Sequence, residues 1–247
     1  MKKISKKNFT NLKNKLKKER EIFLYKAYEL IENGVQIRDP ERIEINGDLF
    51  CGKNVEIGAN VVFEGIVSIG NNVVIGSNCI LSDCIIGNFS YIKSFSSIEG
   101  SKIGEYTFVG PYGRIRPEST IEDNVEIGNF VEIKSSFISS ECRINHHSFI
   151  GDSILDKNVT IGAGTITCNH DGHKINNIHI ESGSYVGSNC SLVAPLKIKK
   201  NSTIGAGSTI TKNVPGGALT IARSKQVSIK NWKGPRSIMP LDQLKKK

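Results

Sequence analysis

The sequence lacks any long apolar run, and this absence limits what the chain can be. No stretch approaches the roughly 18 uncharged apolar residues that a membrane helix needs. The basic N-terminus has no apolar segment behind it, so it does not have the form of a secretory signal. Aromatic residues make up only 7% of the 247 positions, but apolar residues make up 38%, which suits a folded core. We therefore expect a folded cytoplasmic protein.

Acidic residues are scarce at the two ends of the chain. Residues 1–20 carry nine Lys or Arg and one Glu, and residues 223–247 carry eight Lys or Arg and one Asp. Because the whole chain carries +9 and these ends carry +8 and +7, residues 21–222 carry −6. A nucleic-acid-binding protein should be basic on its folded surface. The charge distribution therefore argues against nucleic acid as a partner.

An aliphatic residue recurs every six positions through most of the chain, with occasional steps of five. Two of the runs are Ile103, Val109, Ile115, Ile121, Ile127 and Ile133, and Ile180, Val186, Leu192, Ile198, Ile204 and Ile210. Neither a helical period of 3.6 residues nor strand alternation gives a step of six. The position two before each of these residues is almost always small, and two positions apart on an extended chain means the same face.

Each six-residue unit is thus predicted to be a short strand, with one small and one large inward side chain, followed by a Gly or Asn turn. Three units per coil would build a triangular prism, an all-β solenoid stacked from coils of about 18 residues. Four cysteines fall on the small inward position, where a reduced thiol packs as a small hydrophobe: Cys79, Cys84, Cys142 and Cys190. With no paired CxxC spacing, we expect neither a disulfide framework nor a zinc site.

Before the solenoid, residues 9–34 place Leu, Phe and Ala at helical spacing, and Gly34 stands where the helix should end. We expect this helix to lie against the first coil or a neighbouring chain. The predicted organisation is a basic N-terminus with a helical arm over 1–35, a β-helix over 36–215 and a basic tail over 216–247.

The sixfold pattern is lost over residues 167–179, a polar stretch too long for a turn between coils, which is expected to loop out. All five histidines lie between residues 146 and 179, and such clustering marks a site. One interpretation is a metal site, although no helix or strand fixes the spacing of its residues, which would be His170, Asp171, His173 and His179. They could instead be ordinary residues of a surface loop.

A third interpretation makes His146 a general base, because a rigid coil holds its position more exactly than a loop would. Strand alternation predicts that His146 points outward, while Ile144 and Ser148 point inward. The sequence alone leaves these three interpretations open.

Several motifs together carry a family resemblance. The isoleucine-rich hexapeptides are similar to those of the left-handed parallel β-helix acyltransferases. More narrowly, eight segments resemble, in the same order, the acetyltransferase half of the bifunctional N-acetylglucosamine-1-phosphate uridyltransferase/glucosamine-1-phosphate N-acetyltransferase. These segments are RDPERIEINGDL, GRIRPEST, IGNFVEIK, NHHSFIGD, NVTIGAGTITCNHDG, YVGSNCSLVAP, TIGAGSTITKNVP and IARSKQ.

The resemblance implies a left-handed β-helix, a homotrimer whose long loop reaches a neighbouring prism, and acetyl-CoA bound in the groove between subunits. It also implies acetylation of glucosamine 1-phosphate on the way to UDP-N-acetylglucosamine, with no metal needed for acetyl transfer. Nothing in the sequence resembles the glycine-rich start of the uridyltransferase half, which we expect on a separate chain or on a part of the protein that is missing here.

Carried over residue by residue, the resemblance implies that His146 is the base that accepts a proton from the sugar amine. Arg116 and Lys134 match the cations that hold the sugar phosphate. Glu132 would sit near the amine, although it could equally be a solvated acid. The implied acetyl-CoA contacts are Ala163, Asn169, His170, Ser188, Ala206 and Arg223.

The sequence departs from the family at the acceptor site. Phe149 stands where the family has a phosphate-binding tyrosine, and Thr160 stands where it has an asparagine. Ile175 occupies the place of an expected lysine, which occurs one position earlier as Lys174. These changes leave two alternatives to glucosamine 1-phosphate acetylation: an acetyltransferase for another amino sugar or small amine, and a non-catalytic trimeric scaffold.

Overall fold

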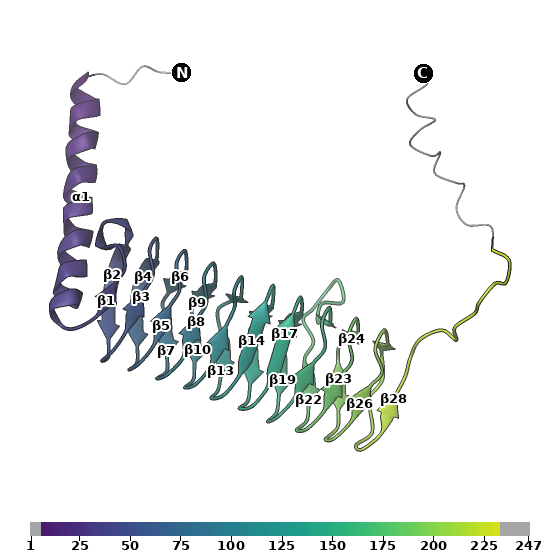
Figure 1. Cartoon of the computed structure of the whole chain (residues 1–247). Coiled ribbons are helices and arrows are strands. Elements are labelled where there is room, and N and C mark those ends of the chain that lie inside the picture. Colours follow the sequence, from purple (N-terminus) through teal and green to yellow (C-terminus); the bar gives the residue numbers. More distant parts are fainter. Residues whose placement is uncertain (1–5, 233–247) are drawn as a thin grey trace, which may run out of the picture.

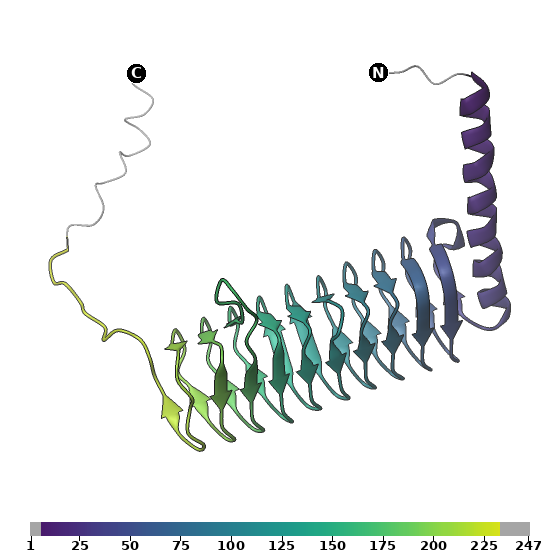
Figure 2. The same ribbon diagram turned by 180° about the vertical axis from the view of Figure 1, so that it is seen from behind.

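A computed structural model of the chain describes residues 6–232. It is a straight stack of coils with one long helix standing at its first coil (Figures 1 and 2). The helix is α1 (Lys6–Glu32), and a short 3-10 turn, η1 (Pro40–Arg42), precedes the second strand. Within the described residues, no helix is both long and apolar enough to span a bilayer.

One face of the prism is a parallel sheet of eleven strands. Its strands are β1 (Gln36–Ile37), β3 (Glu56–Ile57), β5 (Val74–Ile75), β8 (Tyr91–Ile92), β11 (Phe108–Val109), β14 (Glu126–Asn129), β17 (Arg143–His146), β20 (Thr160–Ile161), β23 (Tyr185–Val186), β26 (Thr203–Ile204) and β28 (Leu219–Thr220).

The other two faces belong to a second parallel sheet of seventeen strands. The second face holds β2 (Glu44–Cys51), β4 (Val62–Ile69), β6 (Ile80–Ser82), β9 (Ser97–Glu99), β12 (Arg114–Ile115), β15 (Glu132–Lys134), β18 (Phe149–Gly151), β21 (Ile166–Cys168), β24 (Ser191–Val193) and β27 (Thr209–Ile210). The third holds β7 (Ile85–Ile86), β10 (Lys102–Ile103), β13 (Thr120–Ile121), β16 (Phe137–Ile138), β19 (Ser153–Leu155), β22 (Ile178–Ile180) and β25 (Leu196–Ile198), and the long strands β2 and β4 continue onto it.

The repeating aliphatic residues form one continuous core, as the sequence predicts. In the runs given above, every aliphatic residue is at most 2% exposed. Like residues stack on like residues, since Ile127 pairs with Ile144 and Ile144 with Ile161 in successive coils. Each buried aliphatic side chain contributes about 1.5–3 kcal/mol relative to an exposed one, so this ladder is the main source of stability.

The four cysteines predicted at the small inward position are buried and unpaired. Burial raises the pKa of the Cys79 and Cys142 thiols to about 11 and that of Cys84 to about 12. A thiol that stays protonated is a poor nucleophile. These cysteines therefore act as packing residues, as predicted.

The corners of the prism are tight turns, and many use a residue with a positive φ angle. Asparagine fills this position often, as at Asn54, Asn60 and Asn72, because its short polar side chain tolerates the left-handed conformation. Side chains also bond from coil to coil at the corners; Asn60 Nδ2, for example, donates to Asn78 Oδ1 over 3.0 Å.

The helix α1 packs on the first coil only through its C-terminal half. Ala27 is fully buried, Arg20 Nη1 donates to the Ile43 carbonyl over 2.8 Å, and Lys26 Nζ donates to the Gly47 carbonyl over 2.7 Å. By contrast, Leu12 and Leu16 are 50% and 64% exposed, since the N-terminal half rises away from the prism (Figure 1). Gly34, with φ +93°, follows the helix end, as predicted.

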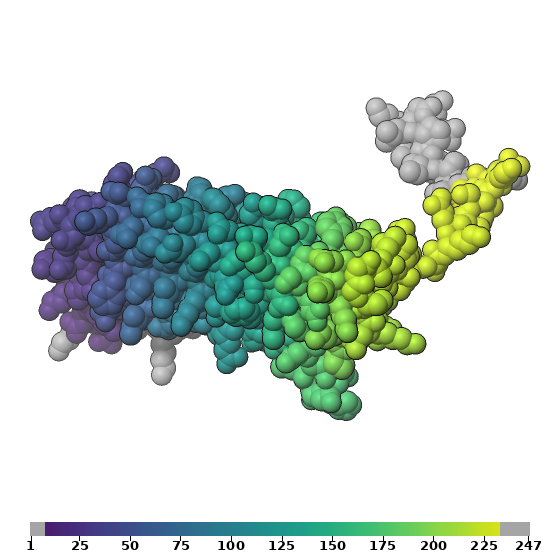
Figure 3. Space-filling model, turned by 90° about the horizontal axis from the view of Figure 1, so that it is seen from below, coloured from purple at the N-terminus to yellow at the C-terminus, as the bar shows by residue number. Residues whose placement is uncertain are grey.

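The polar insertion is shorter than the sequence indicated. Strand β21 runs through Cys168 and β22 begins at Ile178, so the loop spans residues 169–177. Thr167 and His179, the predicted ends, lie on strands because they pair with the coils on either side. The loop rises above the row of turns beside it in Figure 1 and projects from the rod in Figure 3.

Candidate active site

Two corners of the prism hold most of the candidate site residues. The chain turns at the first corner from the eleven-stranded face to the second face. We call it the histidine corner, and its residues are Asn129, His146, Ala163, Ser188 and Ala206. At the next corner the chain turns from the second face to the third. We call that one the lysine corner, and its residues are Arg116, Lys134, Asp152 and Asn169.

The histidine corner is a straight column of equivalent positions. Each of its five residues comes two positions after a core residue of the eleven-stranded sheet, and those core residues pair from coil to coil. The parallel register therefore brings residues that are far apart in sequence into one line. Beyond the end of that line, Arg223 Nη1 donates to the Ala206 carbonyl over 2.9 Å.

His146 ends strand β17 and its side chain is exposed, whereas Ile144 and Ser148 are buried. The predicted outward direction of His146 is thus confirmed. Its ring lines a groove of about 410 Å³ whose other walls include Lys93, Phe108, Pro111, Gly128 and Asn129. The His146 Nδ1 atom lies 2.9 Å from Asn129 Oδ1, one coil away. The ring is therefore held from the side, next to open space.

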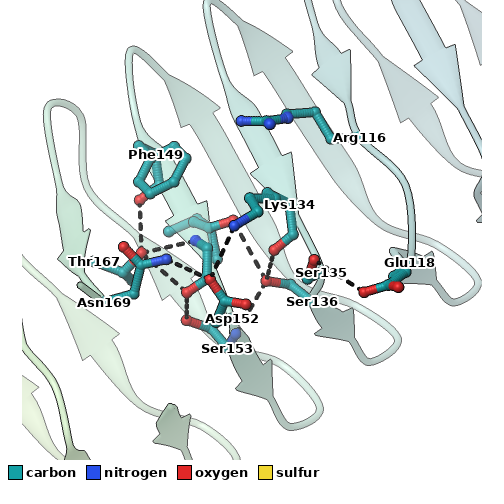
Figure 4. Close-up of polar contacts among 12 residues, drawn as sticks. Arg116, Glu118, Lys134, Ser135, Ser136, Phe149, Asp152, Ser153, Thr167 and Asn169 are labelled. Atoms are coloured by element: carbon teal, nitrogen blue, oxygen red, sulfur yellow. Dashed lines mark hydrogen bonds and ion pairs between the residues drawn. The ribbon is translucent and has the colours of Figure 1, made fainter. Parts of the chain in front are cut away.

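The lysine corner is a network of charges and amides (Figure 4). Lys134 Nζ lies 3.7 Å from Asp152 Oδ2, and Asn169 Nδ2 donates to the same carboxylate oxygen. Thr167 Oγ1 accepts from Gly151 N over 2.7 Å, which fixes the backbone beneath this network. Lys134 and Asp152 are 28% and 12% exposed, so their charges are only partly screened by water.

Arg116 lies at the same corner, next to Glu132. Its Nη1 atom is 2.9 Å from Glu132 Oε1, and both side chains are about one-third exposed. Glu132 is thus neither isolated nor simply solvated, because it partly neutralises the guanidinium. The formal charge of this group is zero, because two carboxylates, Glu132 and Asp152, balance the cations Arg116 and Lys134. An incoming anion therefore has to compete with the two carboxylates.

Phe149 lies on β18 between the two corners. A Cβ placed on Gly151 would come within 2.7 Å of Phe149 Cζ and within 2.8 Å of Asn169 Nδ2. Glycine at this position therefore leaves room for the ring and the amide. The part of the ring that borders the lysine corner is Cζ, the atom that carries the hydroxyl in tyrosine. In phenylalanine this edge is apolar.

Not all predicted site residues come together within one chain. Thr160 lies on β20 of the eleven-stranded face, paired with Arg143 and Tyr185, while Phe149 lies on the second face. His170 belongs to the loop, where its Nδ1 accepts from Gly172 N over 3.1 Å. The implied acceptor and acetyl-CoA contacts are thus divided between two faces and the loop.

The loop histidines do not form a metal cluster in the structure. His179 lies on β22 and its Nε2 is 3.1 Å from both carboxylate oxygens of Asp156. Asp171 instead organises the loop itself, accepting from the backbone N–H groups of His173 and Lys174 and from Asn176 Nδ2. Within residues 8–232, no three His, Cys, Asp or Glu side chains are grouped to hold a metal ion.

Sequence reasoning missed two residues of the site, Asn129 and Asp152. Asn129 stands 17 positions before His146, and Asp152 stands 18 after Lys134. These separations equal one coil of the solenoid, so a search for polar residues one coil from each candidate would have found both.

The comparisons with known proteins agree with this architecture. The family described as "Hexapeptide repeat of succinyl-transferase" matches residues 51–83 and 177–212. "Bifunctional protein GlmU" of Nitrosomonas eutropha is 51% identical over 207 residues, covering 84% of this chain and 45% of that protein. The same protein of Nitrosomonas europaea is 50% identical over 210 residues, covering 85% and 46%.

Among solved structures, a mutant of perosamine N-acetyltransferase from Caulobacter crescentus, in complex with CoA and GDP-perosamine, is 16% identical. The match covers 51% of this chain and 53% of that chain, with a TM-score of 0.37.

The fold and the repeat define the class: the chain is a left-handed parallel β-helix of hexapeptide repeats. Within that class it is similar to the C-terminal acetyltransferase half of bifunctional protein GlmU, as the motifs predict. The chain spans about half the length of the curated relatives that it matches.

Proposed function

We propose that the chain is an acetyl-CoA-dependent N-acetyltransferase that converts glucosamine 1-phosphate to N-acetylglucosamine 1-phosphate. The observation that carries this proposal is the placement of His146, exposed beside an open groove and held by Asn129 at one ring nitrogen. Such a ring offers its other nitrogen, Nε2, to a substrate. The likeness to GlmU supports the choice of reaction.

His146 is the general base. In the reaction the sugar amine attacks the carbonyl carbon of the acetyl thioester, so that a C–N bond forms as the C–S bond breaks. His146 Nε2 takes the proton from the nitrogen and returns it to the departing thiolate, which leaves as free thiol. A histidine ring can both accept and release a proton in this way, which is why histidine is the commonest general base in enzymes.

Arg116 and Lys134 hold the sugar phosphate. A guanidinium can meet two phosphate oxygens in a fork, while an ammonium acts as a point charge. The phosphate competes with Glu132 for Arg116 and with Asp152 for Lys134. A doubly charged anion competes for these cations better than a single carboxylate.

Acetyl-CoA lies along the histidine corner. The small side chains of Ala163 and Ala206 leave room for a slender chain beside the coils, and the Ser188 hydroxyl lies between them in the same column. Arg223 offers a cation beyond the last of them. Asn169 and His170 complete the contacts from the loop side of a neighbouring subunit, which requires a homotrimer.

The product would feed UDP-N-acetylglucosamine synthesis, with a uridyltransferase activity supplied by another polypeptide segment. Its partners are then the sugar phosphate, acetyl-CoA and two further copies of the chain, and it acts in the cytoplasm.

One observation favours a second candidate acceptor. The apolar edge of Phe149 faces the lysine corner, where a phosphate would gain from a hydroxyl donor. An unphosphorylated amino sugar or another small amine would tolerate that edge better.

Free-thiol release from acetyl-CoA, measured with a panel of phosphorylated and unphosphorylated amino sugars, tests both candidates. Release with glucosamine 1-phosphate and detection of its N-acetyl product by mass spectrometry support the proposal. Release only with another amine supports the second candidate, and no release with any acceptor identifies a non-catalytic scaffold.

A further inference from the structure

The eleven-stranded face is irregular at one place. Strands β14 and β17 are four residues long, whereas each of the other nine strands of that sheet has two residues. The extra pairing carries the ladder into the histidine corner, where Asn129 is the register partner of His146. The longer ladder therefore sets these two side chains next to each other on neighbouring strands.

Gly128 permits this extension. A Cβ on Gly128 would lie 1.8 Å from the carbonyl oxygen of Asn145, far closer than any real Cβ contact. The backbones of β14 and β17 come this close just before the pair formed by Asn129 and His146. A side chain at Gly128 would push the strands apart and separate that pair.

The contact between the two side chains has a chemical direction. Asn129 Oδ1 lies 2.9 Å from His146 Nδ1, and an amide oxygen can only accept a hydrogen bond. The proton of the neutral ring must then sit on Nδ1, so Nε2 carries the free lone pair. A free imidazole side chain in water prefers the opposite tautomer, with the proton on Nε2.

We propose that Asn129 is a positioning residue that holds His146 in the Nδ1–H tautomer, with Gly128 keeping the pair in contact. The backbone also steadies the histidine, since its carbonyl accepts from Ser148 Oγ over 2.9 Å and from Gly164 N over 3.3 Å. The catalytic consequence, an Nε2 lone pair always ready for the amine proton, rests on the proposed function. The tautomer itself does not.

The first test is the ¹⁵N NMR spectrum of the His146 ring at about pH 9, where histidine is ordinarily neutral. We expect a protonated-type Nδ1 and an unprotonated-type Nε2 in the wild type. Asn129→Ala and Gly128→Ala should each shift the ring toward Nε2–H, and Asn129→Asp, whose carboxylate also accepts, should keep Nδ1–H. Asn78→Ala is the control, because it removes a bond of the same kind farther down the same corner.

A wild-type ring with its proton on Nε2 would overturn the proposal, since the amide would then be donating through its nitrogen. An Asn129→Ala ring with an unchanged tautomer would overturn it equally. Neither result depends on any activity, so each is distinct from a failure of the proposed function.

The second test is kinetic. Asn129→Ala should lower kcat by about tenfold, because one hydrogen bond contributes about 1.4 kcal/mol. KM should change little for both acetyl-CoA and the amino sugar. Asn129→Asp should recover most of kcat. An effect of Asn129→Ala on KM alone would contradict the catalytic consequence. So would a loss of kcat that Asn129→Asp does not restore although that variant keeps the Nδ1–H tautomer. Either result would leave the tautomer assignment standing.

Discussion

At the level of single residues, the two adjacent histidines differ in what their rings meet. His146 lines the groove. The centre of the His147 ring instead lies 5.5 Å from that of the Phe130 ring, and Phe130 in turn stacks on Tyr112. Only His146 is placed to exchange a proton with a ligand in the groove. Their sequence positions alone do not distinguish them as sharply.

This difference makes a matched pair of variants informative. His146→Ala should lower turnover by roughly 10²–10⁴, the contribution of a general base, with little change in acetyl-CoA affinity. His147→Ala should change turnover far less. Steady-state kinetics and calorimetric titration with acetyl-CoA measure the two effects, and equal losses in both variants would rule out His146 as the sole base.

Phe149 tests the nature of the acceptor. Its Cζ atom and the Asn169 amide both border the space next to Gly151, so the hydroxyl added by Phe149→Tyr would project beside the lysine corner. One hydrogen bond to a charged acceptor contributes about 1.5–3 kcal/mol, which is a tenfold to hundredfold change in binding. KM for glucosamine 1-phosphate should fall by about that factor with kcat little changed. A fall in activity instead would indicate a site shaped for an unphosphorylated amine.

At the level of elements, the sequence predicted the strands well and the loop less well. In short strands such as β20 and β26, one small and one large side chain must face inward. This requirement makes a buried aliphatic residue recur every six positions, which is visible in the sequence. The ends of the loop depend on pairing with neighbouring coils, which has no local signal. The exposure of Leu12 and Leu16 was likewise invisible, because helical spacing does not reveal how far a helix extends beyond its partner.

The candidate site could be predicted only in part for the same reason. His146 carried a signal of its own through the clustering of histidines and through family motifs. Asn129 and Asp152 matter because of what lies one coil away, and the occasional five-residue steps change that distance from 18 residues to 17. The partners therefore emerge only once the register is known.

The insertion loop should respond to acid in a defined window. Backbone N–H groups of Lys174 and His173, followed by the Asn176 amide, lower the pKa of Asp171 from 3.8 to about 2. Because the folded pKa is depressed, the loop is stabilised above about pH 4, and this support is lost as the pH falls to about 2. The amide shifts of His173 and Lys174 should titrate with a midpoint near 2 and should lose that titration in Asp171→Asn. A midpoint near 3.8 would show that these bonds do not persist.

At the level of the whole molecule, the division of the site predicts an oligomer. Thr160 and Phe149 lie on different faces of one prism, and the loop projects from the rod (Figure 3). We therefore expect that copies of the chain lie side by side and share the site, as in the homotrimer proposed above. Sedimentation should give a mass of three times the 27.1 kDa of one chain. A monomer at micromolar concentration would remove the shared site.

The reaction proposed for this prism is acetylation of the amine of glucosamine 1-phosphate. The most direct test is to measure kcat/KM for glucosamine 1-phosphate and for glucosamine. The rate is measured both as thiol release and as formation of the N-acetyl product. The two cations at the lysine corner predict a clear preference for the phosphorylated sugar, with one thiol released for each product formed. A preference for unphosphorylated glucosamine, or no acetylation of either sugar, would contradict the proposed reaction.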